Sequence, residues 1–168
     1  MKTRCCVAAV VAVSTLISAT SRAQGQPPGR GADACALVTK AEIEQALGVK
    51  LGDAKKNPRM QNPGVLSSCD YSTPEGGEVG ILIRQNAVKY VIGSEKAEFE
   101  KQGMKLRYMK GLGTTAFFID MFGMGTGLGV FRGDYDYVQL SAMLISGDPA
   151  KIAAGLEKVA RLVIERWK

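Results

Sequence analysis

Apolar residues recur along this chain at two spacings, one typical of helices and one typical of strands. Spacings of three and four residues mark a segment from Thr39 to Gly48 and another that begins at Asp148, and a third segment, from Glu95 to Gln102, has helical composition. Between them lie short runs rich in β-branched and aromatic residues, separated by glycine-containing turns. The pattern predicts the order helix, strands, helix, strands, helix.

The first helix carries its own start and stop signals. Thr39 can cap the free amides of the first turn, and Glu42 stands three residues later, as a capping box requires. Val38 and Ile43 have the spacing of a hydrophobic staple, and Gly48 supplies the C-terminal stop. We expect this helix to bury one face.

The other two helices are defined by caps and by a buried stripe. Ser94 and Gly103 bound the middle helix, and Asp148 with Pro149 begins the last one. The apolar stripe of the last helix consists of Ile152, Leu156, Val159, Ala160, Val163 and Trp167. This stripe predicts that the last helix covers one face of a sheet.

Seven segments have strand character. They are Val49–Lys55, Cys69–Ser72, Glu78–Arg84, Leu106–Lys110, Thr115–Ile119, Leu128–Arg132 and Tyr135–Ala142. Because the connections between neighbouring segments are short, we expect antiparallel pairing. The fold class is therefore α+β: a single domain of mainly antiparallel sheet, with the N-terminal, middle and C-terminal helices packed together on one face.

The N-terminus has the pattern of a secretory signal peptide. Lys2 and Arg4 precede an apolar run from Val7 to Ala19, and small residues up to Ala23 offer a cleavage site. A membrane anchor is the alternative, but the run is short against the roughly 20 residues that a spanning helix needs. We expect a signal peptide over residues 1–23, a flexible Gly/Pro-rich leader over 24–33, a domain over 34–168, and a periplasmic or secreted location without a stable membrane anchor.

The net charge of the chain adds little to the prediction of its function. Residues 1–23 contain three cations and no acid, so their removal lowers the formal charge from +6 to +3. The remaining charges are mixed, and the one local basic cluster, Lys55 to Arg59, has no aromatic residues within it. Nucleic-acid binding is therefore not expected.

Two cysteines remain after export. Cys35 and Cys69 would reach an oxidising compartment, where an isolated pair is most often a structural disulfide. The C-x-x-C spacing typical of redox-active pairs is absent. We expect the bond to fasten the N-terminal helix to the hairpin that contains Cys69.

The composition argues against the commonest enzymes. The chain contains no histidine, which disfavours serine and cysteine nucleophiles and zinc sites, so no catalytic residue, metal or cofactor is assigned. A carboxylate pair remains an alternative, with Asp70 beside Tyr71 as its main candidate among Asp70, Glu75, Glu78, Asp120, Asp134 and Asp136. The alternating glycines from Gly123 to Gly129 lack the pattern and the following helix of a phosphate-binding loop.

A soft apolar surface beside these glycines is the best candidate for binding. Met121, Phe122, Met124 and Thr126 follow one another around a predicted turn, and Tyr71 is the further candidate. Methionine and aromatic side chains suit an apolar ligand or a protein partner.

Several short motifs occur in an order that resembles a known group of proteins. They are Cys35-Ala-Leu-Val-Thr39, Cys69-Asp-Tyr71, Gly111-Leu-Gly113-Thr-Thr-Ala-Phe117 and Arg132-Gly133-Asp134. This order is similar to that of a widespread group of secreted bacterial proteins and lipoproteins that share a domain of unknown function. The resemblance implies a compact α+β domain outside the cytoplasm with its two cysteines bonded, although this chain lacks a lipobox and has Arg132 where Lys is common.

The sequence thus predicts an exported, non-catalytic domain that binds a small molecule or an envelope protein. Two alternatives remain open: a carboxylate-based hydrolase, and a structural or adhesive envelope protein that acts through the Lys55 to Arg59 loop.

Overall fold

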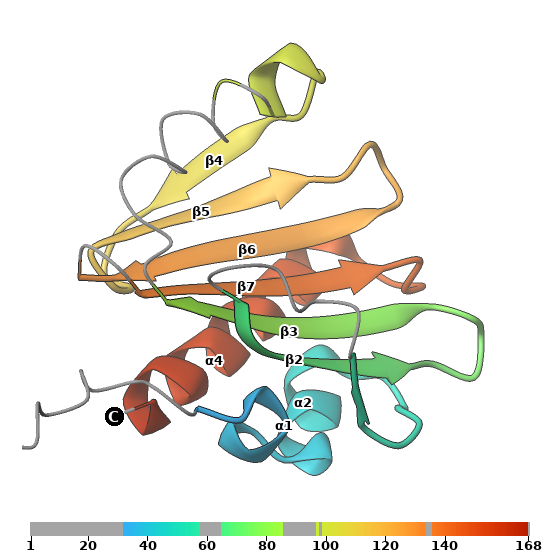
Figure 1. Cartoon of the computed structure of the whole chain (residues 1–168). Coiled ribbons are helices and arrows are strands. Elements are labelled where there is room, and N and C mark those ends of the chain that lie inside the picture. The colour runs from blue at the N-terminus through green and yellow to red at the C-terminus, as the bar shows by residue number, and fades with distance from the viewer. Residues whose placement is uncertain (1–31, 58–64, 86–96, 98, 134–135, 168) are drawn as a thin grey trace, which may run out of the picture.

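A single antiparallel sheet of seven strands forms the centre of the molecule (Figure 1). The computed structural model describes residues 32–57, 65–85, 97, 99–133 and 136–167. The strands follow the order β1-β2-β3-β7-β6-β5-β4 across the sheet. Their bounds are β1 Lys55–Lys56, β2 Val65–Ser72, β3 Glu78–Gln85, β4 Leu106–Met109, β5 Thr115–Asp120, β6 Gly125–Arg132 and β7 Asp136–Met143.

The predicted strands are confirmed with one exception. Val49–Lys55 was expected as a strand, but only Lys55 and Lys56 pair, with Asp70 and Cys69 of β2. The chain from Val49 to Ala54 runs from the end of a helix to the sheet edge and, within the described residues, forms only a single backbone hydrogen bond to β2, from Gly52 N to Ser72 O at 2.7 Å, so it makes no continuous ladder. The α+β class itself is confirmed.

Three helices cover one face of the sheet: α1 (Ala34–Leu37), α2 (Lys40–Leu47) and α4 (Pro149–Arg166) (Figure 1). The N-terminus of α2 forms the predicted capping box, since Glu42 N donates to Thr39 Oγ1 at 3.3 Å and Thr39 N donates to Glu42 Oε2 at 2.9 Å. Val38 and Ile43 are both fully buried in the same core, and Gly48 ends the helix at a φ of +71°. Helix α1 was not predicted.

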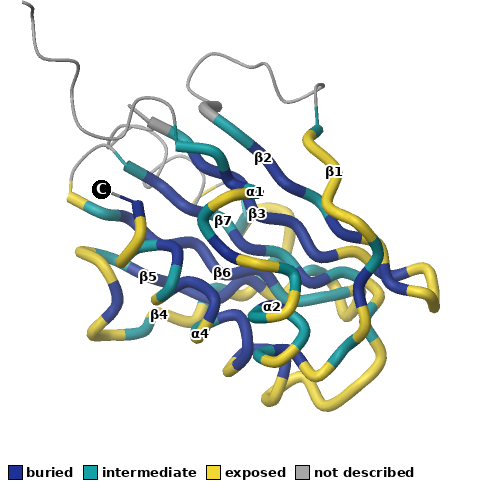
Figure 2. Tube along the Cα trace, turned by 90° about the horizontal axis from the view of Figure 1, so that it is seen from below, coloured by how far each residue is buried: buried dark blue, intermediate teal, exposed yellow. Residues whose placement is uncertain are grey.

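Helix α4 buries its whole predicted stripe. Asp148 caps it, accepting from Ala150 N at 2.9 Å, and Pro149 stands in its first turn. The six stripe residues from Ile152 to Trp167 are all buried against the sheet and α2. In Figure 2, which is seen from below, α4 lies in front of the sheet and much of its trace is dark blue.

The middle helical segment lies on the other face, which corrects the expectation that all helices gather on one side. Ala97 and residues 99–101 are helical, while the predicted start at Ser94 lies outside the described residues. Phe99 packs against a second buried cluster, formed by Phe117, Ile119, Phe131 and Tyr137. These side chains alternate along their strands with those of the main core, so they point away from α4.

The disulfide predicted between Cys35 and Cys69 is present. It joins α1 to the middle of β2, and Ala34 N adds a hydrogen bond of 3.0 Å to Ser67 Oγ. Cys69 is fully buried, so the bond anchors the N-terminal helices to the core rather than to the surface. The predicted signal peptide, most of the leader and the loop from Pro58 to Gly64 lie outside the described residues.

Candidate functional site

A cleft opens where α4 stops covering the sheet. Helix α4 packs on β6 and β7, whereas β4 and β5 extend beyond it. The space between the first turn of α4 and the exposed strands has a volume of about 680 Å³. This volume falls within the roughly 300–1,000 Å³ typical of small-molecule sites.

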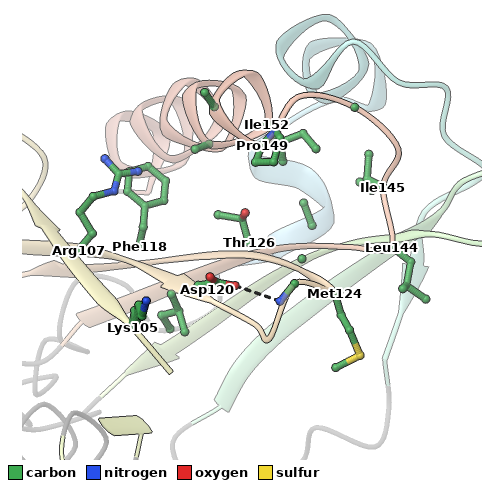
Figure 3. A pocket seen from close by; sticks show the side chains of 17 residues that line it. Lys105, Arg107, Phe118, Asp120, Met124, Thr126, Leu144, Ile145, Pro149 and Ile152 are labelled. Carbon is green, nitrogen blue, oxygen red and sulfur yellow. Dashed lines mark hydrogen bonds between the residues drawn. The ribbon is translucent and has the colours of Figure 1, made fainter. Parts of the chain in front are cut away.

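The floor and one wall of the cleft are mainly apolar (Figure 3). Phe118 and Thr126 rise from β5 and β6, and Ile152 faces them from α4. Ile145, from the loop between β7 and α4, closes the end of the cleft. Side chains two residues apart on a strand, and directly opposite each other on neighbouring strands, lie on the same face of the sheet. Phe118 is opposite Leu128 of the main core, and Thr126 is two residues before Leu128 on β6, so all three lie on this face.

Two cations and one carboxylate stand along the open side. The guanidinium carbon of Arg107 lies 4.6 Å from the centre of the Phe118 ring, and Lys105, two residues earlier and just before β4, also lines the cleft. Asp120 also lines the cleft, where its Oδ1 accepts from Gly123 N at 3.2 Å. The cleft therefore offers a net positive charge beside an apolar floor.

The rim of the cleft carries exposed apolar side chains on an unusual backbone. Phe122, Met124 and Leu144 are 57%, 50% and 63% exposed. Phe122 and Leu144 have φ values of +57° and +52°, which are uncommon for residues other than glycine. Such conformations cost of order 1–3 kcal/mol and are often found at functional sites. Met124 and Leu144 line the cleft and form its apolar rim, and Phe122 is next in the chain to the lining residue Gly123.

The predicted binding residues separate into several places. Met124 and Thr126 line the cleft, whereas Phe122 does not line it and lies exposed on the turn, next in the chain to the lining residue Gly123. Met121 instead packs against the second cluster on the opposite face. Tyr71 is 1% exposed in the main core, where burial raises the pKa of its phenol and the carboxylate of Asp33 raises it further.

Sequence reasoning missed the residues that the fold brings to the cleft from elsewhere. Lys105 and Arg107 look like ordinary solvated charges of an edge strand, and Leu144 and Ile145 look like the end of β7. The alternation of Lys105 and Arg107, with one residue between them, was the available signal, because it puts both cations on one face.

The alternating glycines do not form an empty face. A Cβ at Gly129 would lie 2.7 Å from Tyr137 Oη and 2.9 Å from Phe117 Cζ. A Cβ at Gly127 would lie 3.0 Å from Met121 Cε. Side chains of the neighbouring strands thus occupy the space beside Gly127 and Gly129, and these two glycines serve the packing of the second cluster, whereas a Cβ at Gly123 would meet no atom within 4 Å.

The main carboxylate candidates meet in a shallower hollow at the other edge of the sheet. Asp70 and Glu78 line a space of about 380 Å³ together with Lys55. Asp70 accepts from Asn57 Nδ2 at 2.9 Å, and Glu78 is exposed. Neither acid occupies the apolar, water-excluded surroundings that a general acid needs at neutral pH.

No group of three or more Cys, His, Asp or Glu side chains that could hold a metal ion occurs within the described residues. Among the helices that the structure describes, none has the length and apolar character needed to cross a membrane.

Comparison with known proteins gave no match: no family model fits the chain, and neither the curated proteins nor the solved structures contain a significant relative. The resemblance to exported bacterial domains therefore stays a prediction.

Proposed function

We propose that this protein is an exported, non-catalytic domain that binds a small molecule in the cleft between β4, β5 and the first turn of α4. The single observation that carries the proposal is the cleft itself, an apolar floor under a rim of exposed apolar side chains. Small-molecule sites are typically such concave, mostly apolar spaces with a few polar groups at fixed positions.

The chemistry of the lining favours binding over reaction. Lys105, Arg107, Asp120 and Thr126 are the polar side chains that line the cleft within the described residues. The carboxylate of Asp120 is exposed to solvent and engaged with the amide of Gly123, and no second carboxylate lines this cleft. Acid and base catalysis by a carboxylate pair has no support there.

The disulfide supports export. Disulfides persist in oxidising compartments, and the Cys35–Cys69 bond ties α1 to the core of the domain. A periplasmic or secreted location agrees with the signal-peptide pattern of residues 1–23.

An uncharged apolar dye tests the proposal. N-phenyl-1-naphthylamine fluoresces in apolar surroundings, and we expect it to bind the purified protein with one site per chain. Ala150→Trp places a large ring at the cleft, because Ala150 is an exposed lining residue of the first turn of α4. Dye binding should fall at least about tenfold, as expected when roughly 1.4 kcal/mol of binding free energy is lost.

Ala154→Trp is the matched control, since Ala154 is an exposed alanine one turn further along α4 that does not line the cleft. It should bind the dye as the wild type does. Equal loss of binding in both variants, or no binding by the wild type, would argue against the cleft as the binding site.

A further inference from the structure

The cations of the cleft stand where a ligand group would meet them. Arg107 lies on β4 and Lys105 lies just before its first residue, where the backbone carbonyl of Lys105 accepts a 3.2 Å hydrogen bond from Asp120 N. Both side chains are exposed and line the cleft. Within the described part of the chain neither forms an ion pair, although five other cations do.

The apolar part of the cleft lies next to these cations rather than apart from them. The Arg107 guanidinium lies over the face of Phe118, 4.6 Å from its centre, so the charge and the floor belong to one surface. Ile145 and Ile152 continue this surface towards α4 (Figure 3). A ligand that fills the cleft would touch apolar side chains along its length and a positive charge at its open side.

We propose that the ligand is an anionic amphiphile, a single apolar chain whose carboxylate or phosphate head lies between Lys105 and Arg107. The inference rests on the proposed function of the cleft as a binding site and specifies its ligand class. Charge complementarity carries it: two unpaired cations at one end of an apolar cleft favour a negative head, and arginine suits the planar, two-oxygen geometry of such groups.

The charge of Asp120 provides a way to distinguish an anionic ligand from a zwitterionic one. Its carboxylate would attract the amine of an amino acid or peptide, but it would repel the head of an acid. Asp120→Asn removes the charge and retains an oxygen that can accept from Gly123 N. The variant should therefore bind an anionic amphiphile more tightly and a zwitterion more weakly.

Three competitors with the same chain test the head group. Decanoate, decanol and decylamine, each kept below its aggregation concentration, displace N-phenyl-1-naphthylamine from the wild type. We expect decanoate to displace the dye at a concentration roughly three- to tenfold lower than decanol, as exposed charge pairs typically allow, and decylamine to be the weakest. Equal displacement by all three would overturn the inference while leaving the proposed cleft function intact.

Charge variants then locate the preference. Arg107→Gln and Lys105→Gln should each reduce the advantage of decanoate over decanol about twofold to fivefold, when both competitors are compared at the dye affinity measured for that variant. Lys158→Gln is the control, because Lys158 is exposed on α4 outside the cleft. An advantage that survives both cleft variants, or that Lys158→Gln removes, would contradict the assignment.

An experiment with lipid vesicles distinguishes a dissolved acid from a membrane lipid as the source of the anionic head group. Sedimentation with vesicles of phosphatidylglycerol shows whether the protein takes its anionic group from a membrane surface. A free acid as ligand predicts displacement by dissolved decanoate and weak sedimentation. Strong sedimentation together with no displacement by decanoate would overturn the proposal of a free, single-chain ligand.

Discussion

The amide of Leu144 donates a hydrogen bond of 2.7 Å to the carbonyl oxygen of Met124. This bond fastens the loop between β7 and α4 to the turn between β5 and β6, and it sets two exposed apolar side chains side by side at the cleft. Met124 N in turn donates to Met121 O at 3.0 Å, so the turn is hydrogen-bonded within itself. The rim of the cleft is thereby held in place before any ligand arrives.

Leu144→Gly should weaken ligand binding with little effect on stability. The left-handed backbone of Leu144, with a φ of +52°, favours glycine, and its side chain is 63% exposed. Relief of strain and the larger entropy of the unfolded glycine chain oppose each other, so we expect a change of less than about 1 kcal/mol in the free energy of unfolding. Urea unfolding and dye titration measure the two quantities; a loss of stability above about 2 kcal/mol would show that Leu144 serves the core.

Gly129→Ala should destabilise the protein, whereas Gly127→Ala should not. The new Cβ at position 129 would meet the buried rings of Tyr137 and Phe117 at 2.7 and 2.9 Å. Overpacking of this kind costs about 1–3 kcal/mol. At Gly127 the nearest atom, at 3.0 Å, is the flexible end of Met121, so we expect a change within about 1 kcal/mol.

Thermal unfolding of both variants and the wild type compares these glycines directly. The same melting temperature for Gly129→Ala and the wild type would mean that the second cluster is loosely packed.

The ion pair between Glu42 and Arg166 should make stability depend on acid. Hydrogen bonding to Arg166, at 2.6 and 2.8 Å, together with the Thr39 amide, lowers the pKa of Glu42 from 4.5 to about 2. Because the folded state holds Glu42 ionised more strongly than the unfolded chain does, this contribution is complete above about pH 4.5 and is lost as the pH falls towards 2.

Arg166→Gln should therefore lower the melting temperature by a small amount at pH 6, because the pair is exposed, and by progressively less between pH 4.5 and 2. Lys158→Gln, which removes an exposed cation of the same helix, should show no such trend. If the difference in melting temperature between the wild type and Arg166→Gln stays constant over this pH range, the contribution of Arg166 comes instead from its hydrogen bond to Leu37 O.

Removal of the disulfide should lower the free energy of unfolding of the domain by several kcal/mol. Cys35 and Cys69 are separated by 34 positions, and closing a loop of about that length stabilises a fold by roughly 3–4 kcal/mol in the chain-entropy model. The Cys35→Ala/Cys69→Ala variant, compared with the wild type in urea, measures the difference. Mass spectrometry before and after reduction checks the bond in the exported protein; free thiols at both positions would contradict it.

Local features of the fold were predictable from the sequence. The capping box of Thr39 and Glu42 and the stripe of α4 depend on spacing within one segment, and both occur as expected. It was harder to predict which face of the sheet each helical segment covers. The segment around Phe99 lies on the face opposite α4. Its own sequence does not indicate this face, because the face is determined by contacts with Phe117 and Phe131 further along the chain.

The candidate site was predicted only in part for the same reason. Met124 and Thr126 belong to the turn that the sequence singled out, and they line the cleft. Lys105, Arg107 and the first turn of α4 join them only through the strand order that places β4 at the edge, beyond the cover of α4. Met121 turned to the opposite face because side chains alternate along the hairpin.

The position of a bound ligand shows whether the cleft between β4, β5 and α4 is the binding site. Methyl resonances of the isotope-labelled protein, followed by NMR during titration with decanoate, report where the chain lies. We predict shifts at Ile145, Ile152 and Leu144, which line the cleft, and none at Ile43, which is buried on the inner face of α2 and does not line the cleft. Saturable shifts confined to methyl groups elsewhere, or none at all at millimolar decanoate, would contradict binding in this cleft.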